Sequence, residues 1–202
     1  RNIYLHQKAG DRAVFNFDND ITRELWDAFD RGEVTKDYVT LERYVLLLRS
    51  LGLEVRDPAR CNRDYLTALG EGVYPLPYAE EVCQELVRRG HKLYILTNAV
   101  ASVQRSRLRG SVFAALITAA FISEDAGASK PDRAYYDYVR AQIPELTAEN
   151  CLVIGDSLAT DIRGANNAGL PCCWFNPKGQ APSKGLRIDH TITDLRQLLD
   201  IV

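Results

Sequence analysis

Residues 153–161 read Val-Ile-Gly-Asp-Ser-Leu-Ala-Thr-Asp, an apolar run that passes into Gly155-Asp156 and, after four more residues, into Asp161. This pattern predicts a buried strand that ends at a polar turn, with a helix beginning at Asp161. Gly-Asp after a strand commonly forms a turn, and an aspartate there commonly caps the helix that follows. In a parallel sheet, however, polar residues at the carboxyl ends of strands are also the usual binding residues. The neighbouring strands help to separate these two explanations.

The same alternation of short strands and helices extends over residues 74–202. Each expected strand is a short apolar run, which is typical of a sheet covered on both faces. Strand-helix alternation of this kind predicts an α/β fold, with a Rossmann-like parallel sheet and helices on both faces. Strands are expected at residues 93–96, 119–122, 151–154 and 172–175, and helices at residues 79–89, 101–108, 133–143, 161–168 and 195–201.

The preceding stretch, residues 22–70, has a helical pattern instead. Leu25 and Trp26 share a helical face, and the region from Gly52 to Pro58 interrupts the pattern. Asp57-Pro58 is typical of a helix start, so a further helix is expected over residues 60–69.

Composition sets outer limits on the function. The chain has 202 residues, 46% of them hydrophobic and 26% charged, which suits one α/β domain with a modest insertion. A net charge of −2 predicts no nucleic-acid partner. No apolar run is long enough to cross a bilayer and no signal peptide is visible, so we expect no membrane partner and a cytoplasmic location.

The sequence contains no methionine, which indicates either that its native start lies outside it or that methionines are missing from it.

The five cysteines show no metal-ligand spacing. Reduced thiols are therefore expected in preference to disulfides or a zinc site. Cys172 and Cys173 are adjacent, so they should point to opposite faces of any strand that they share.

Two other predicted strands also lead into distinctive polar residues. Thr97 and Asn98 directly follow the strand at residues 93–96, and Lys130 lies in a Ser-Lys-Pro sequence shortly after the strand at residues 119–122. Taken singly, Thr97-Asn98 is explained as a helix cap and Lys130 as part of a solvated loop.

Together, these strand-end residues suit phosphoryl transfer. A hydroxyl and backbone N–H groups can hold phosphoryl oxygens, a lysine can offset their negative charge, and carboxylates can hold Mg²⁺ through oxygen. Such sites act mainly by positioning and by stabilising developing charge. We therefore predict Thr97 and Lys130 as catalytic residues, Thr97, Asn98 and Lys130 as substrate-binding residues, and Asp156 and Asp161 as metal-binding residues.

With these residues in place, the sequence resembles the haloacid dehalogenase (HAD) superfamily of phosphatases. Thr97 matches its second motif, Lys130 its third, and Asp156 with Asp161 its fourth. The resemblance covers nearly all of residues 22–202. It points to the subgroup of pyrimidine 5′-nucleotidases and N-acylneuraminate-9-phosphatase-like enzymes, on segments that include Leu25-Trp26-Asp27-Ala28-Phe29, Ile122-Ser123-Glu124-Asp125 and Cys173-Trp174-Phe175-Asn176-Pro177.

The resemblance implies a domain arrangement and an activity. Residues 1–22 and 74–202 would form a HAD-like core, and residues 23–73 a small helical cap. The activity implied is Mg²⁺-dependent hydrolysis of a small phosphorylated metabolite, such as a nucleoside monophosphate or a sugar phosphate, by a monomer or homodimer.

The first motif of the family is matched by Asp18-Asn19-Asp20-Ile21-Thr22, which follows Ala13-Val14-Phe15-Asn16-Phe17. The resemblance implies that Asp18 is the nucleophile and forms an aspartyl-phosphate. Asp20 would be the general acid for the leaving oxygen and then the base for water. Asp18 and Asp20 would bind Mg²⁺ together with Asp156, with Asp161 behind them.

Three alternatives stay open at this stage. Val14, Phe17 and Ile21 also lie at helical spacing, so this stretch could be a cap helix, although a core without the first-motif strand would leave its neighbours without a hydrogen-bonding partner. A haloacid dehalogenase would use the same aspartate on carbon without Mg²⁺, but Asp20 argues against it. A catalytically inactive or truncated relative would bind its ligand without turnover.

Overall fold

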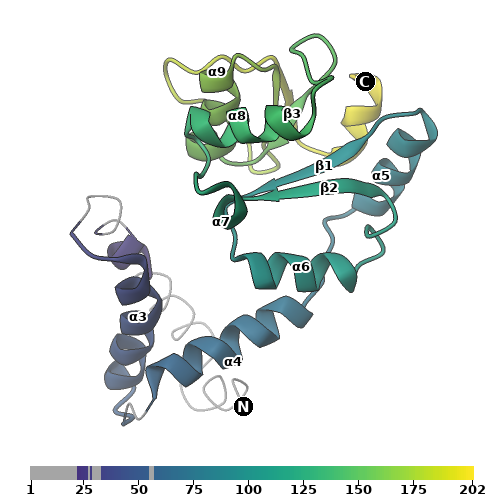
Figure 1. Cartoon of the computed structure of the whole chain (residues 1–202). Helices are drawn as coiled ribbons and strands as arrows, with labels where there is room; N and C mark the ends of the chain where they lie inside the picture. The colour runs from purple at the N-terminus through teal and green to yellow at the C-terminus, as the bar shows by residue number, and fades with distance from the viewer. Residues whose placement is uncertain (1–21, 27, 29–32, 55–56) are drawn as a thin grey trace. The chain divides into compact units, whose positions relative to one another are not determined.

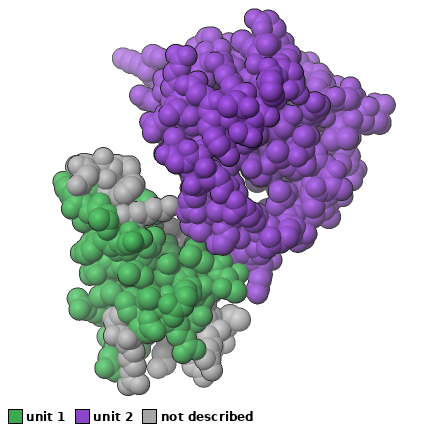
Figure 2. Space-filling view, in the orientation of Figure 1, with its two compact units in different colours: residues 1–69 green, residues 70–202 purple. Residues whose placement is uncertain are grey.

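The computed structural model describes residues 22–26, 28, 33–54 and 57–202. The chain divides into two compact units, residues 1–69 and residues 70–202 (Figure 2). The predicted division into a core of residues 74–202 with residues 1–22 and a cap of residues 23–73 stays a prediction. The assignment of residues 1–22 to that core stays a prediction, because all but the last of them lie outside the described residues. Among the described helices, none combines the length and the apolar character needed to span a membrane.

The described part of the first unit is helical. After a short helical stretch at residues 22–26, α3 spans Lys36–Ser50 and α4 spans Pro58–Glu71. The side chain of Thr35 accepts a hydrogen bond from the Tyr38 N–H at 3.2 Å and so caps α3. Asp57 does the same for α4 by accepting from the Arg60 N–H at 2.9 Å. The helix start predicted at Asp57-Pro58 is confirmed.

The second unit contains parallel strands only. β1 (Leu93–Thr97) pairs with β2 (Ile117–Ile122), as Figure 1 shows. β3 (Val153–Gly155), β4 (Cys172–Phe175) and β5 (His190–Ile192) form a second sheet in that order. The α/β class with parallel strands is confirmed. Within the described residues, the strands form two separate sheets and not one continuous sheet.

Helices follow the strands as expected, with differences in detail. They are α5 (Ala79–Arg88), α6 (Ala101–Arg109), α7 (Ser123–Ala126), α8 (Arg133–Gln142), α9 (Arg163–Ala168) and the final 3₁₀-helix η2 (Leu195–Asp200). The single helix predicted for residues 161–168 is wrong at its start, because a π-helix, η1 (Leu158–Ile162), precedes α9. The reason is a wide first turn, in which the Ile162 N–H donates to the Ser157 carbonyl at 3.1 Å. The strand predicted from residue 151 begins only at Val153, and α7 and β5 were not predicted.

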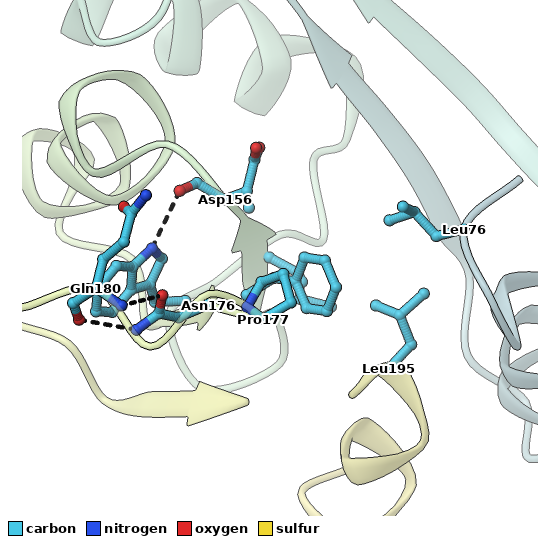
Figure 3. A pocket seen from close by; sticks show the side chains of 10 residues that line it. Leu76, Asp156, Asn176, Pro177, Gln180 and Leu195 are labelled. Carbon is cyan, nitrogen blue, oxygen red and sulfur yellow. Dashed lines mark hydrogen bonds between the residues drawn. The ribbon is translucent and has the colours of Figure 1, made fainter. Parts of the chain in front are cut away.

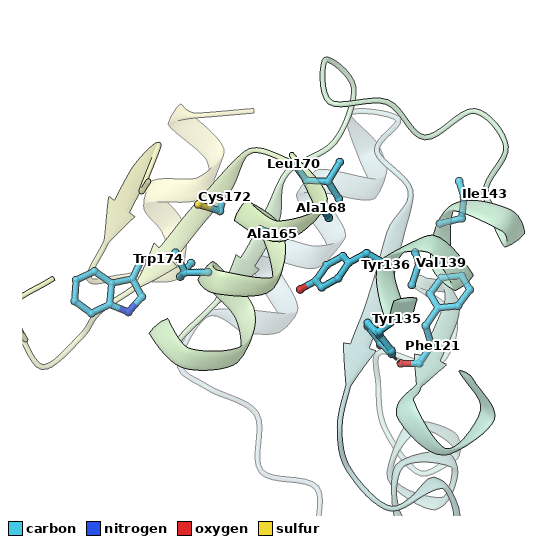
Figure 4. Packing of buried hydrophobic residues seen from close by; sticks show 11 residues of the cluster. Phe121, Tyr135, Tyr136, Val139, Ile143, Ala165, Ala168, Leu170, Cys172 and Trp174 are labelled. Atoms are coloured by element: carbon cyan, nitrogen blue, oxygen red, sulfur yellow. Dashed lines mark hydrogen bonds between the residues drawn. The ribbon is translucent and has the colours of Figure 1, made fainter. Parts of the chain in front are cut away.

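Two hydrophobic clusters lie on opposite faces of the second sheet. The adjacent residues Cys172 and Cys173 of β4 are both fully buried and belong to different clusters, which confirms the prediction that they point to opposite faces. All five cysteines are free. The first core consists of Phe121, Tyr135, Tyr136, Val139, Ile143, Ile162, Ala165, Ala168, Leu170, Cys172 and Trp174 (Figure 4). The second core consists of Val82, Leu86, Cys173, Ile192 and Leu198.

The first core also joins the two sheets. Phe121 comes from β2, and Trp174 comes from β4. Between them lie the tyrosines of α8, and Figure 4 shows the Tyr136 ring pointing toward α9. Since one apolar cluster contacts both sheets, the carboxyl ends of β1 and β3 are held in a common framework.

The contact between α8 and α9 gives a stability test. A Cβ added at Gly164 would lie 2.5 Å from the Tyr136 hydroxyl and 2.6 Å from its ring Cε2, and Tyr136 is only 1% exposed. We therefore expect Gly164→Ala to lower the free energy of unfolding by roughly 1–3 kcal/mol, measured by urea unfolding. Gly110→Ala is the matched control, because its Cβ would meet nothing closer than 3.6 Å, and its expected change is below about 1 kcal/mol. Equal losses in both variants would contradict this account.

Candidate functional site

The carboxyl end of β1 is tied to β2 by a buried tyrosine. The Tyr135 hydroxyl donates to the Phe121 carbonyl at 2.6 Å and accepts from the Thr97 N–H at 3.0 Å. Burial raises the pKa of Tyr135 to about 12, so its phenol stays protonated and keeps both bonds at neutral pH. The backbone of Thr97 is therefore held in place by a side chain of α8.

The hydroxyl oxygen of Thr97 accepts two hydrogen bonds. One comes from the backbone N–H of Ala99 at 3.1 Å, and the other from Nε2 of Gln104 at 3.0 Å. Gln104 lies on α6 and was not among the residues predicted from the sequence. Both the backbone and the side chain of Thr97 are thus held by neighbours.

Asn98 holds the loop that carries Lys130. Its Oδ1 accepts from the Lys130 N–H at 2.9 Å, and its Nδ2 donates to the Lys130 carbonyl at 2.9 Å. On the other side of the loop, Asn167 Nδ2 donates to the Pro131 carbonyl at 3.0 Å. The amide of Asn98 therefore positions the lysine in this structure, and its predicted contact with substrate stays a prediction.

The side chain of Lys130 connects the two sheets at their carboxyl ends. Its ammonium nitrogen, Nζ, donates to the Leu96 carbonyl of β1 at 2.8 Å and to Asp161 Oδ1 at 2.6 Å. The two side chains are 12% and 11% exposed, so this ion pair is largely shielded from water. The other carboxylate oxygen of Asp161, Oδ2, accepts from the Ser157 N–H at 3.1 Å.

The glycine at the end of β3 makes room for this pair. A Cβ at Gly155 would lie 2.4 Å from Cβ, Cγ and Oδ2 of Asp161. Any larger residue would displace the carboxylate that holds Lys130. The Gly-Asp sequence that was noted as an ordinary turn therefore has a specific packing role.

Asp156, the next residue, is in a different environment from Asp161. It is exposed, and its backbone carbonyl accepts from Nε1 of Trp174 at 3.0 Å. Asp156 lines an open pocket of about 460 Å³, and Figure 3 shows its carboxylate pointing away from Asn176 and Pro177. The same pocket is lined by the loop after β4, where the buried Asn176 bonds the Gln180 backbone through both Oδ1 and Nδ2, at 2.9 and 3.0 Å.

The residues predicted to bind a metal differ in how available their carboxylates are for Mg²⁺. Asp156 offers an exposed carboxylate, and oxygen is the ligand that Mg²⁺ prefers. Both carboxylate oxygens of Asp161 are already engaged, so its place in the structure suits holding Lys130. The other predicted ligands, Asp18 and Asp20, lie outside the described residues, and no group of three or more candidate ligands gathers within them.

Known proteins match both the sequence and the fold. The haloacid dehalogenase-like hydrolase family matches residues 10–169. The chain belongs to this family. The HAD-hydrolase YfnB of Bacillus subtilis (strain 168) is 40% identical over 182 residues, which is 90% of this chain and 77% of YfnB. The pyrimidine 5′-nucleotidase PynA of Streptococcus pneumoniae (strain ATCC BAA-255 / R6) is 31% identical over 180 residues, 89% of this chain and 76% of PynA.

The predicted subgroup is confirmed, because the relatives of this HAD-like hydrolase include pyrimidine 5′-nucleotidases and N-acylneuraminate-9-phosphatases. Among solved structures, magnesium-bound YfnB from Bacillus subtilis has a TM-score of 0.85 at 35% identity, covering 94% of this chain and 82% of that one. The L-2-haloacid dehalogenase of Xanthobacter autotrophicus has a TM-score of 0.77 at 17% identity, covering 99% and 90%. That second likeness shows the fold alone.

The hydrogen bonds of Tyr135 to β1 and β2 give one test of the site. In Tyr135→Phe, the Thr97 N–H and the Phe121 carbonyl both lose the partner described above. We expect the free energy of unfolding to fall by about 1–3 kcal/mol in a urea titration. Tyr138→Phe, which keeps the edge-on ring contact with Phe121, should change it by less than about 0.5 kcal/mol. A Tyr135→Phe variant as stable as the parent would contradict the role of the phenol.

The shielded ion pair gives a second test. Lys130→Met and Asp161→Asn each remove one charge and leave the other largely shielded from water without its partner, so we expect each to cost about 2–4 kcal/mol in unfolding free energy. The double variant should cost less than the sum of the two, with a coupling of at least about 1 kcal/mol.

An exposed pair on the same unit supplies the control. Lys92 Nζ lies 2.9 Å from Glu145 Oε1, and the two side chains are 62% and 56% exposed. Lys92→Met should therefore cost less than about 1 kcal/mol. Strictly additive effects at Lys130 and Asp161 would show that the two side chains do not depend on each other.

Proposed function

We propose that the chain is a Mg²⁺-dependent phosphatase that hydrolyses a small phosphomonoester through an aspartyl-phosphate. One observation carries the proposal. At the carboxyl ends of β1 and β3, specific contacts hold a hydroxyl and a lysine, and the exposed carboxylate of Asp156 directly follows β3, in a chain that belongs to a hydrolase family. The named phosphatases and nucleotidases among its relatives support the same reaction class.

Asp18 is proposed as the nucleophile. Its carboxylate oxygen attacks phosphorus, and the bond from phosphorus to the ester oxygen breaks. Asp20, as general acid, gives its proton to the departing oxygen. It then takes a proton from the water that attacks the aspartyl-phosphate, which releases inorganic phosphate and restores Asp18. Supporting this assignment, the family match begins at residue 10, before both aspartates.

Thr97 and Lys130 are proposed to hold the phosphoryl oxygens. An ammonium group has three N–H donors. Among the described residues, Lys130 uses one on the Leu96 carbonyl and one on Asp161, so one donor is left for a phosphoryl oxygen. The ion pair keeps this donor in place, and the Thr97 hydroxyl supplies another.

Mg²⁺ would be held by Asp156 together with Asp18 and Asp20, with Asp161 behind them. When bound, it would offset negative charge on the phosphoryl oxygens. The exposed carboxylate of Asp156 supports its place as a direct ligand. Asp161, already engaged by Lys130 and Ser157, would act by keeping the lysine and the turn in position.

The substrate is proposed to be a nucleoside monophosphate or a sugar phosphate, bound in the cytoplasm by a monomer or homodimer without nucleic-acid or membrane partners. The pyrimidine 5′-nucleotidases among the relatives favour the first of the two substrates. The five free cysteines fit a reducing compartment. The dehalogenase alternative gains no support, because its structural likeness at 17% identity extends only to the fold.

Hydrolysis of p-nitrophenyl phosphate tests the proposal. We expect turnover with Mg²⁺, loss of turnover with EDTA, and a loss of roughly 1,000-fold or more in Asp18→Asn, since the nucleophile is removed. Asp200→Asn, an exposed substitution of the same kind at the C-terminal end, is the control and should keep full activity.

Two outcomes would contradict parts of the proposal. Unchanged activity in Asp18→Asn would remove the assignment of the nucleophile. Absence of hydrolysis by the parent across nucleotides and sugar phosphates would favour a relative that binds its ligand without turnover.

A further inference from the structure

The side chain of Gln104, on α6, is one of two donors to the Thr97 hydroxyl oxygen. A hydroxyl group has two acceptor lone pairs and one donor hydrogen. The Ala99 N–H and the Gln104 amide nitrogen both donate to the Thr97 oxygen, at 3.1 and 3.0 Å. Because both lone pairs are occupied by donors, the hydrogen of Thr97 has to point in the one direction that is left, as a donor.

We propose that Gln104 is a positioning residue that sets the Thr97 hydroxyl as a hydrogen-bond donor to the phosphoryl group. This inference rests on the proposed function, in which Thr97 contacts a phosphoryl oxygen. The oxygens of an ionised phosphate ester act as acceptors, so they need a donor opposite them. With Gln104 in place, the hydroxyl hydrogen cannot point toward Gln104 or toward the Ala99 N–H and stays available as a donor.

The position of Gln104 is itself well defined. The Ala101 N–H at the start of α6 donates to Glu124 Oε2 at 3.0 Å, and Arg105 pairs with Asp125 Oδ1 at 2.7 Å. Both acidic residues belong to α7. Helical side chains lean toward the N-terminus of their helix, so Gln104 reaches back to the end of β1. The donor is thus placed before any ligand binds, which is what a preorganised site requires.

The competing explanation is an ordinary structural link between α6 and β1. The two explanations differ in the direction of the hydrogen bond. Gln104→Glu keeps the shape of the side chain, but a carboxylate only accepts and would draw the Thr97 hydrogen toward itself. Gln104→Met has a similar length and neither donates nor accepts strongly. A structural link would be weakened by both changes, whereas a positioning role makes the carboxylate the more harmful one.

The experiment measures kcat/KM for p-nitrophenyl phosphate with Mg²⁺ in a double-mutant cycle. We expect Thr97→Val to lose on the order of 100-fold, the usual cost of one donor to a transition state. Gln104→Glu should lose about 10-fold or more, and Gln104→Met less than Gln104→Glu. In the Thr97→Val background, Gln104→Glu should cost less than about twofold, because there is no hydroxyl left to misdirect.

The pH profile separates hydrogen-bond direction from packing. The introduced carboxyl group can donate once it is protonated, and its ordinary pKa is about 4.3. The activity of Gln104→Glu relative to the parent should therefore rise as the pH falls toward about 5, while the ratio for Gln104→Met stays flat. Gln142→Glu, at an exposed position in the last turn of α8, is the charge-matched control and should follow the parent at every pH.

Each outcome decides between named alternatives. If Gln104→Glu costs the same with and without the Thr97 hydroxyl, the effect is charge repulsion and the positioning role is overturned. If Thr97→Val itself leaves kcat/KM unchanged, the proposed function of Thr97 fails. A parent that binds inorganic phosphate without turnover allows the same cycle on its dissociation constant, measured by calorimetry. A parent that neither hydrolyses nor binds phosphate overturns both proposals.

Discussion

The ammonium group of Lys130 is the point on which the site depends. It donates to the Leu96 carbonyl near the end of β1 and to the carboxylate of Asp161 in η1, which follows β3. It therefore connects the two described sheets. A charge that is only 12% exposed needs a fixed partner, because burial without one is costly. That partner, Asp161, is held by the Ser157 N–H and has room only because residue 155 is glycine.

Neutral hydrogen bonds hold the backbone around this charged pair. Asn98 clamps the Lys130 peptide groups, and Tyr135 connects the Thr97 backbone to β2. In the proposed function, the Lys130 ammonium and the Thr97 hydroxyl are then left to act on a ligand. It also explains why the two aspartates of one short sequence differ: Asp161 is shielded and engaged by Lys130, whereas Asp156 is exposed at a pocket.

Local sequence patterns predicted the helices and strands that are long enough to show a hydrophobic repeat or that form a continuous apolar run. The strand predicted at residues 172–175 is β4, with the same bounds, because a short apolar run buried on both faces allows little else. β5 has only three residues, His190–Ile192, and its strand character comes from pairing with β4, so no local pattern indicated it. The prediction that residues 13–17 form a strand in the core stays a prediction, since they lie outside the described residues.

The sequence indicated which residues form the candidate site, but it did not indicate the contacts that they make. Thr97, Lys130 and Asp161 stood out because each follows a strand, and in the structure Lys130 bonds both Asp161 and the carbonyl of Leu96, the residue before Thr97. The role of Gln104 depends on where α6 lies relative to β1, which no short-range pattern specifies. Its place soon after the start of the helix that follows Thr97 was the one available signal, since side chains there lean back toward the strand end.

The charges of Lys130, Asp161 and Asp156 give a physical reason for a metal cofactor in the proposed reaction. The positive charge of Lys130 is matched by the negative charge of Asp161, and Asp156 adds a further negative charge that is open to solvent. A phosphate monoester brings its own negative charge to the same strand ends, and like charges at such short range repel. Asp18 and Asp20, if they join the site as proposed, make this repulsion stronger. A divalent cation on Asp156 would reverse the local sign, which is the physical reason that the proposed reaction includes Mg²⁺.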